Sequence, residues 1–383
     1  MEEMAIQTDK KQDKTLSRIQ GSLIAGAAGD ALGYEVEFLS DEAIQRRYGP
    51  QGITKYKLYD GKALFSDDTQ MTLFTANGLL YGETHTRILK TDEDPHVFIP
   101  TAYADWLYTQ DHSCRPARFH SWIAGIPELN NRRAPGNTCL SALMSGETGT
   151  IGKPINDSCG CGGVMRVAPV GLFYGRGYDD ITPENIILYG ALAAACTHGH
   201  PMGYIPAGLM SLIVFRMAFT DEPVRELIFD SLDETGKLFG ENPYWRSFQA
   251  LINQAADCSM NTESDRENIR RLGEGWIGNE ALAIAVYAVL RYEKDLGKAL
   301  IAAVNHDGDS DSTGAITGNI LGARVGMEGI IADWTNDLEL KDTILEMGTD
   351  LWAHCPAESE LRSEKSDWNR KYVQICGLNQ EMR

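Results

Sequence analysis

The chain has 383 residues and 43% of them are hydrophobic, which is enough to bury one large core or two ordinary ones. Its 54 acidic residues outnumber 35 basic ones, giving a formal net charge of −19, and this argues against a nucleic-acid partner held by a basic surface. The eight cysteines include no CxxC pair, so we expect no zinc knuckle and predict a reducing, cytoplasmic location.

The N-terminal segment, residues 1–14, is polar and of mixed charge. It predicts a disordered tail ahead of one domain over residues 15–383, with neither a signal peptide nor a membrane anchor. The longest apolar run, residues 204–219, is too short for a membrane span and contains Arg216. We therefore expect a buried helix there and no membrane partner.

A helical pattern begins near Leu16 and ends near Gly33, with small residues along its flank that would let a second helix approach closely. Glu35 and Glu37 follow it in a loop. An acid flanked by the aromatic and aliphatic residues of this loop is partly desolvated, which favours a raised pKa and general acid or base work.

A second acidic stretch, Ser66-Asp67-Asp68, lies at another loop-to-helix junction after a loop-like segment, residues 40–64. No segment alternates convincingly with period two, and residues 300–304, which fit a short strand, fit the end of a helix equally well. Further helices are predicted over residues 98–110, 137–144, 183–196, 202–219, 224–238, 244–256, 267–272 and 279–292.

Three features between residues 111 and 200 are candidates for contact with an anionic substrate. Four arginines, Arg115, Arg118, Arg132 and Arg133, are either phosphate partners or, more often for such residues, solvated surface groups. The glycines around Cys161 permit close approach of backbone N–H groups to an anion, or a tight turn between helices. His198 is more plausibly a hydrogen-bonding partner of substrate than a metal ligand.

The segment 305–314 places Asp307, Asp309 and Asp311 on alternate residues just before a helix, with two hydroxyls after them. One Asp would suffice as an N-cap, and three repel one another unless a cation neutralises them. All-oxygen ligands favour Mg²⁺ or Mn²⁺, and the two acidic stretches together offer enough oxygens for two ions.

The helix that follows carries glycine at every fourth position from 314 to 326, each costing about 1 kcal/mol relative to alanine. Close packing against another helix must compensate for this cost. The first helix, which also has small residues along its flank, is the expected partner. That contact would bring Asp309 and Asp311 toward the loop that carries Glu35 and Glu37.

Taken together, these motifs closely resemble the ADP-ribosylglycohydrolase family, and the match extends from about residue 18 to 355. The motifs that carry the resemblance are Gly29-Asp30-Ala31-Leu32-Gly33, Ser66-Asp67-Asp68-Thr69, Gly160-Cys161-Gly162-Gly163-Val164-Met165-Arg166, Thr197-His198, Gly273-Glu274-Gly275-Trp276 with Glu280-Ala281-Leu282, and Gly308-Asp309-Ser310-Asp311-Ser312-Thr313. The resemblance implies an all-α, single compact multi-helix domain that hydrolyses an ADP-ribosyl bond, often to arginine.

The resemblance also implies roles for individual residues. It implies two Mg²⁺ or Mn²⁺ ions bound by Ser66, Asp67, Asp68, Asp309, Asp311 and Ser312. It implies catalysis by Glu37, Asp68 and Asp309, with Glu37 also meeting substrate and Glu35 as the alternative to it. Gly162, Gly163 and Val164 would cradle the diphosphate, and His198 would line the same cleft. The chain departs from the family at Cys161, where Asn is common, and at Asp307, where Gly or Ser is common.

The implied partner is an ADP-ribosylated protein or an ADP-ribose-containing small molecule, and an ADP-ribosyltransferase is a further candidate. An EF-hand is disfavoured because Ser312 and Gly318 stand where its loop needs Gly and Glu. A phosphatase with an Asp nucleophile would need a preceding strand and alternating βα units. A non-catalytic member that binds ADP-ribose or a toxin partner remains the third alternative.

Overall fold

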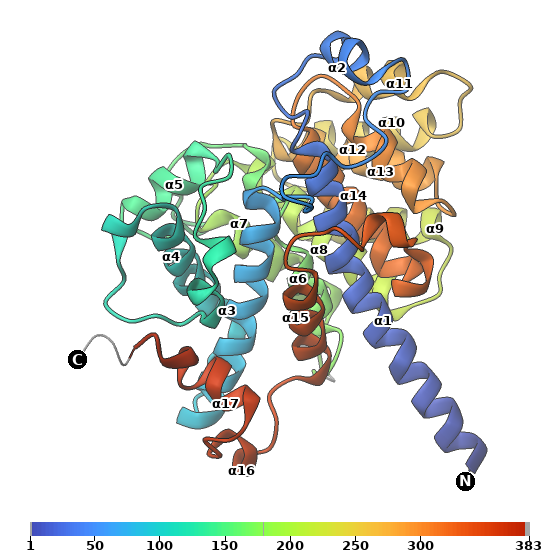
Figure 1. Cartoon of the computed structure of the whole chain (residues 1–383). Coiled ribbons are helices and arrows are strands. Elements are labelled where there is room, and N and C mark those ends of the chain that lie inside the picture. Colours follow the sequence, from blue (N-terminus) through green and yellow to red (C-terminus); the bar gives the residue numbers. More distant parts are fainter. Residues whose placement is uncertain (1, 179, 380–383) are drawn as a thin grey trace.

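The computed structural model describes residues 2–178 and 180–379, and within them the side chains from residue 14 onward. The α-helices are α1 (Glu2–Gly33), α2 (Asp41–Tyr48), α3 (Asp67–Leu89), α4 (Ile99–Gln110), α5 (Asn137–Met144), α6 (Ala168–Tyr174), α7 (Pro183–Ala195), α8 (Pro201–Phe219), α9 (Val224–Phe239), α10 (Trp245–Cys258), α11 (Asp265–Leu272), α12 (Gly278–Arg291), α13 (Leu296–Val304), α14 (Ser310–Val325), α15 (Lys341–Ala353), α16 (Glu358–Leu361) and α17 (Asp367–Tyr372). Figure 1 shows them as one helical body. Strand pairing in the described ranges is limited to isolated bridges, so the expected all-α, single-domain fold is confirmed.

The first helix and the glycine-rich helix form the largest helix–helix contact, as the sequence predicts. A Cβ atom added at Gly318 would lie 1.9 Å from the carbonyl oxygen of Ala25, and one at Gly314 would lie 2.4 Å from that of Gly29. Alanine at either position would therefore force the backbones apart. This crossing sets the end of α1 beside the start of α14, where the candidate site lies (Figure 1).

Helix α8 runs through the interior of the molecule and packs against α7, α6 and α12. It has 19 residues and is long and apolar enough to cross a membrane, so the expectation that it is too short was wrong. However, 83% of its apolar window is buried inside the protein. That burial accounts for its composition as a core helix, and one such helix is weak evidence for a span.

Two local expectations differ from the structure, and one that was open is decided by it. The segment 300–304, which fitted either a short strand or the end of a helix, is the second half of α13, a helix whose apolar residues face the core. The loop predicted over residues 40–64 contains α2, which begins where the Ser40 hydroxyl accepts a hydrogen bond from the Ala43 N–H. The buried residues of α2 are Asp41 and Ile44, so this helix has no apolar stripe that the sequence could reveal.

The disordered tail predicted over residues 1–14 also differs from the structure, in which α1 begins at Glu2. The first part of α1 projects from the body in Figure 1. Glu, Lys, Gln and Met are good helix formers, which favours a helix in this segment. Among the described side chains, Lys14 Nζ lies 2.8 Å from an oxygen of Asp221.

Candidate functional site

A cavity of about 190 Å³ lies where the starts of α3, α5 and α14 meet the glycine turn at residues 160–163. The predicted site residues that line it are Glu37, Asp67, Asp68, Gly162, His198, Asp309, Asp311 and Ser312. Segments up to 275 residues apart in the chain, from Glu37 to Ser312, thus meet around one cavity. Lysine and arginine are absent from its lining within the described part of the chain.

The start of α3 directs two carboxylates into this cavity. Ser66 is the N-cap of the helix: its hydroxyl oxygen accepts from the Asp68 N–H at 3.2 Å and lies 3.2 Å from Asp68 Oδ2. The Asp67 carboxylate accepts from the Gly136 N–H at 3.2 Å. Asp68 Oδ1 is buried and has no hydrogen-bond partner among the described residues. The helix start therefore leaves a carboxylate oxygen free to bind a ligand.

The start of α14 brings a second pair of carboxylates, those of Asp309 and Asp311, to the same cavity. Asp309 is the N-cap, and its Oδ1 accepts from the Ser312 N–H at 3.2 Å, while Asp311 Oδ1 accepts from the same N–H at 2.9 Å. The other oxygen of Asp309 accepts a hydrogen bond from the Cys161 thiol at 2.6 Å. Cys161, one of the two departures from the family, therefore contacts a predicted metal ligand directly.

Sequence reasoning missed the role of Asp30, a fully buried residue in the last turn of α1. Its carboxylate accepts hydrogen bonds from the Ser66 N–H at 2.8 Å, the Thr69 N–H at 2.9 Å and the Thr69 hydroxyl at 2.5 Å. Burial and the nearby charge of Asp311 raise the pKa of Asp30 to about 7. The Gly29–Gly33 motif could have signalled this, because an Asp amid small apolar helix residues needs specific partners.

The electrostatics of the cavity favour a cation. Burial first, and then repulsion from neighbouring carboxylates, raise the pKa values of Asp67, Asp68 and Asp309 well above the usual range. The same two causes raise the pKa of Glu37, whose Oε2 is buried without a hydrogen-bond partner. Clustered carboxylates without a basic neighbour cost free energy unless protons or a cation neutralise them.

The donor set fits hard divalent ions in its chemistry, since carboxylate and hydroxyl oxygens surround two unpartnered oxygens, Asp68 Oδ1 and Glu37 Oε2. In the described ranges, no group of three or more His, Cys, Asp and Glu side chains is already drawn together as a metal site.

The glycine turn contributes less than the resemblance implies. Gly162 lines the cavity, but the Val164 N–H donates to the Cys161 carbonyl at 2.7 Å and is not available to a diphosphate. A Cβ at Gly163 would lie 2.8 Å from the Gly203 carbonyl oxygen, so Gly163 serves the approach of α8. The start of α5 instead brings Gly136, Asn137 and Thr138 to the cavity wall, where helical N–H groups attract anions.

Other candidates lie away from the cavity. Glu35 forms ion pairs with Arg47 at 2.8 Å and Lys57 at 3.0 Å, so it is no substitute for Glu37. Arg133 pairs with Glu339 at 2.8 Å and is not a free phosphate ligand. Asp307 lines a different cavity, and its Oδ1 accepts from the Asp41 N–H at 2.8 Å. The second family departure therefore lies outside the carboxylate cluster.

Comparisons with known proteins show which family and which relatives this chain is similar to. The family model for ADP-ribosylglycohydrolase matches residues 11–360. Human ADP-ribosylhydrolase ARH3 is 24% identical over 361 residues, covering 85% of this chain and 90% of its own. The ADP-ribosyl-[dinitrogen reductase] glycohydrolase of Rhodospirillum rubrum is 25% identical over 331 residues, covering 85% and 91%. An uncharacterized protein of Archaeoglobus fulgidus is 27% identical over 344 residues, covering 88% and 96%.

A solved structure described as an ADP-ribosylglycohydrolase-related protein complex superposes with a TM-score of 0.56 at 20% identity. The alignment covers 89% of this chain and 99% of that one, and it shows a shared fold. With the family model spanning most of the chain and the motif residues gathered around one cavity, this protein belongs to the ADP-ribosylglycohydrolase family.

Proposed function

We propose that this protein is a metal-dependent hydrolase that cleaves the glycosidic bond between ADP-ribose and a modified arginine of a target protein. The observation that carries the proposal is the cavity in which the acidic starts of α3 and α14 face each other beside Glu37, with no lysine or arginine in its described lining. An ADP-ribosyltransferase would supply the substrate. Because the eight cysteines are all free, we place the reaction in a reducing cytoplasm.

Six side chains are proposed to hold two Mg²⁺ or Mn²⁺ ions: Ser66, Asp67, Asp68, Asp309, Asp311 and Ser312. When bound, such ions hold ribose hydroxyls and polarise a water molecule near the anomeric carbon. Asp30 keeps the α3 ligands in place through its three hydrogen bonds to Ser66 and Thr69. Packing of α1 on α14 then fixes the distance between the two ligand pairs.

Hydrolysis breaks the bond from the anomeric carbon to the guanidine nitrogen and forms a bond from that carbon to the water oxygen. The proton lost by the water must reach the leaving nitrogen. We assign its transfer to Glu37, because Oε2 is buried and unpartnered and because burial raises the pKa of this carboxyl. The carboxylates of Asp68 and Asp309 stabilise the positive charge that develops on the ribose ring.

A second cavity, of about 330 Å³, is a candidate site for the arginine side of the bond. Trp276 lines both cavities, and the loop that carries it packs on the start of α14 through a 2.9 Å hydrogen bond from the Asp309 N–H to the Glu274 carbonyl. Asp307 and Glu274 also line the second cavity, and its two arginines, Arg266 and Arg270, pair with Asp41 instead. The carboxylates of Asp307 and Glu274 therefore suit a guanidinium group.

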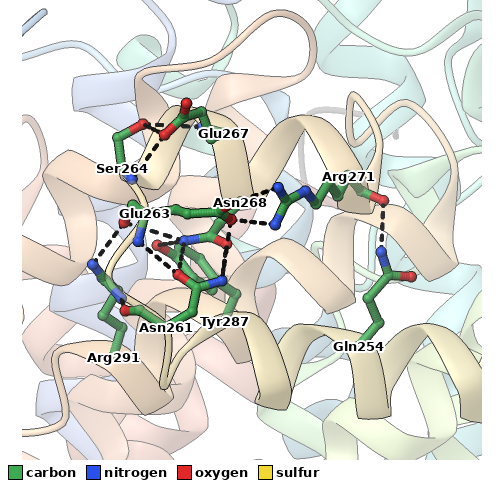
Figure 2. Close-up of polar contacts among 9 residues, drawn as sticks. All are labelled: Gln254, Asn261, Glu263, Ser264, Glu267, Asn268, Arg271, Tyr287 and Arg291. Carbon is green, nitrogen blue, oxygen red and sulfur yellow. Dashed lines mark hydrogen bonds and ion pairs between the residues drawn. The ribbon is translucent and has the colours of Figure 1, made fainter.

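Helix α11 brings Arg266, Ile269 and Arg270 to the second cavity, and other residues of α11 take part in the polar network shown in Figure 2. The side chains of Asn261 and Asn268 exchange hydrogen bonds of 2.7 and 3.0 Å, and Arg291 donates to the Asn261 carbonyl at 2.8 Å. Ser264 and Glu267 form a capping box at the start of α11. The network ties α11 to α12, and Arg266 of α11 forms an ion pair of 2.9 Å with Asp41.

We expect Glu274→Gln and Asp307→Asn each to raise KM for an ADP-ribosyl-arginine peptide about tenfold, the effect of losing one charged hydrogen bond. Binding of free ADP-ribose should stay unchanged, because neither residue lines the first cavity. Steady-state kinetics and calorimetry measure the two quantities, with Glu241→Gln, an exposed site, as the control. An unchanged KM in both variants would place the arginine elsewhere.

The direct test of the proposed function is release of free ADP-ribose from an ADP-ribosyl-arginine protein, followed by chromatography. We expect release with Mg²⁺, loss of at least about a hundredfold with a chelator, and recovery when Mg²⁺ or Mn²⁺ is restored. The same assay with serine-linked and nucleobase-linked substrates tests the linkage. Tight ADP-ribose binding without release from any of them would favour the non-catalytic alternative.

A further inference from the structure

Arg166 is a fully buried cation without an acidic partner in the described structure. Its guanidinium lies 4.2 Å from the centre of the Tyr103 ring, and its Nη1 contacts the sulfur atoms of Met71 at 3.4 Å and Cys139 at 3.5 Å. Its Nη2 donates to the Ala193 carbonyl at 3.2 Å, and its buried Nε has no hydrogen-bond partner among the described residues. A buried cation that pairs with no carboxylate costs stability.

The strongest of these hydrogen bonds goes to the side chain of Thr197, whose hydroxyl oxygen accepts from Arg166 Nη2 at 2.6 Å. The same hydroxyl lies 2.8 Å from His198 Nδ1 and 3.4 Å from the Ala194 carbonyl oxygen. That carbonyl already accepts the backbone N–H groups of Thr197 and His198. A hydroxyl has one proton, and the shorter contact, to His198 Nδ1, is the one within normal hydrogen-bond range.

We propose that Arg166 and Thr197 are positioning residues that hold His198 as the neutral tautomer with its proton on Nε2. Arg166 donates a hydrogen bond to the Thr197 hydroxyl oxygen, and that hydroxyl donates its proton to His198 Nδ1. The single ring proton of neutral His198 is therefore on Nε2. The inference rests on the proposed function in one respect, namely that ADP-ribose is the molecule this N–H meets.

The direction of the His198 ring supports the proposal. A Cβ atom added at Gly162 or Gly160 would lie 3.3 or 3.4 Å from His198 Nε2, so this nitrogen faces the glycine turn at the edge of the carboxylate cavity. Burial and the charge of Arg166 lower the pKa of His198 to about 3, so the ring is neutral at physiological pH. A neutral ring offers a donor at Nε2 only in this tautomer.

The chemistry of the ligand makes the tautomer matter. The ribose and diphosphate oxygens of ADP-ribose are mainly acceptors, so an Nε2–H binds them whereas an Nε2 lone pair repels them. We therefore expect Thr197→Val to weaken ADP-ribose binding about tenfold, the loss of one charge-assisted hydrogen bond. Thr197→Ser, which keeps the hydroxyl, should restore wild-type affinity.

The decisive measurement is made on the unmodified protein, labelled with ¹⁵N in its eight histidines. Two-bond ¹H–¹⁵N correlation identifies the protonated nitrogen of His198, and the peak is assigned by its absence in His198→Gln. We expect protonated Nε2 in the wild type and a mixture of tautomers in Thr197→Val. The control is Thr235→Val, which removes a buried hydroxyl bonded only to the Ser231 carbonyl.

Protonated Nδ1 in the wild type would overturn the proposal, whether or not any variant folds. Unchanged ADP-ribose affinity in a folded Thr197→Val protein would also overturn it. A wild-type protein that shows the expected tautomer but does not bind ADP-ribose at all would refute the proposed function and leave the positioning of His198 standing. The two failures are therefore distinguishable.

Discussion

Asp309→Asn is expected to reduce hydrolysis of an ADP-ribosyl bond about a thousandfold while making the metal-free protein more stable. The amide keeps the N-cap of α14, because its oxygen can still accept from the Ser312 N–H as Asp309 Oδ1 does at 3.2 Å. It removes a negative charge and one oxygen ligand from the cavity. Burial and repulsion from Asp311 raise the pKa of Asp309 well above its usual range, so ionising it costs stability at neutral pH.

Proton linkage gives the direction of the stability change in Asp309→Asn. A carboxyl whose pKa is raised by folding stabilises the folded state at pH values below its ordinary pKa and loses that contribution as the pH rises. An amide has no proton to lose, so we expect a higher Tm than the wild type at pH 8 without metal and little difference near pH 3. Thermal unfolding with a chelator measures this, and chromatography of released ADP-ribose measures activity.

Asp333→Asn is the matched control, because it makes the same change of carboxylate to amide at an exposed position. It should alter neither activity nor Tm beyond experimental scatter. Near-wild-type hydrolysis by Asp309→Asn would contradict the assignment of this residue. A fall in both activity and Tm would instead indicate that the carboxylate has a structural role that Asn cannot replace.

The carboxylate cluster was predictable from sequence because each half is local. Ser66 with Asp68, and Asp309 with Ser312, satisfy the helix ends within three residues of each other, and capping rules identify such pairs without knowledge of the fold. The glycine spacing of α14 also specified its partner, because a helix must have small residues along its flank, as α1 has, to approach α14 closely.

The direction of individual side chains was less predictable. Asp307, Asp309 and Asp311 alternate in sequence, but Gly308 has a φ of 117° and the helix starts at Ser310, so Asp307 faces another cavity. Alternation predicts a shared face only where the backbone is extended.

Individual polar side-chain partners that are distant in sequence were not predictable. Arg133 finds Glu339 at a separation of 206 residues, and Asp30 finds Thr69 at a separation of 39. The sequence contains both members of each pair but no local rule that joins them. The same holds for Arg166 and Thr197, whose contact depends on how α7 packs. Helix positions follow from local periodicity, whereas these pairings follow only from the assembled core.

The contact between α1 and α14 gives the second large expected effect. We expect Gly318→Ala to destabilise the protein by about 3 kcal/mol, in the range of overpacking in a tight core. In a free helix the same change is favourable by about 1 kcal/mol, so the sign of the result tests the contact itself. The added Cβ would lie 1.9 Å from the Ala25 carbonyl oxygen and 2.7 Å from the Gly26 nitrogen, both of them backbone atoms inside a helix.

Guanidinium denaturation measures the free energy of unfolding, and Gly152→Ala, where nothing lies within 4 Å of the new Cβ, is the control with an expected change under about 0.5 kcal/mol. Adding Ala25→Gly to Gly318→Ala should not restore stability, because the clash is with the carbonyl oxygen and not with the Ala25 methyl group. Rescue by Ala25→Gly would show that the helices approach through side chains. Activity should fall with stability in Gly318→Ala, since the displaced α14 carries Asp311 and Ser312 away from the carboxylates of α3.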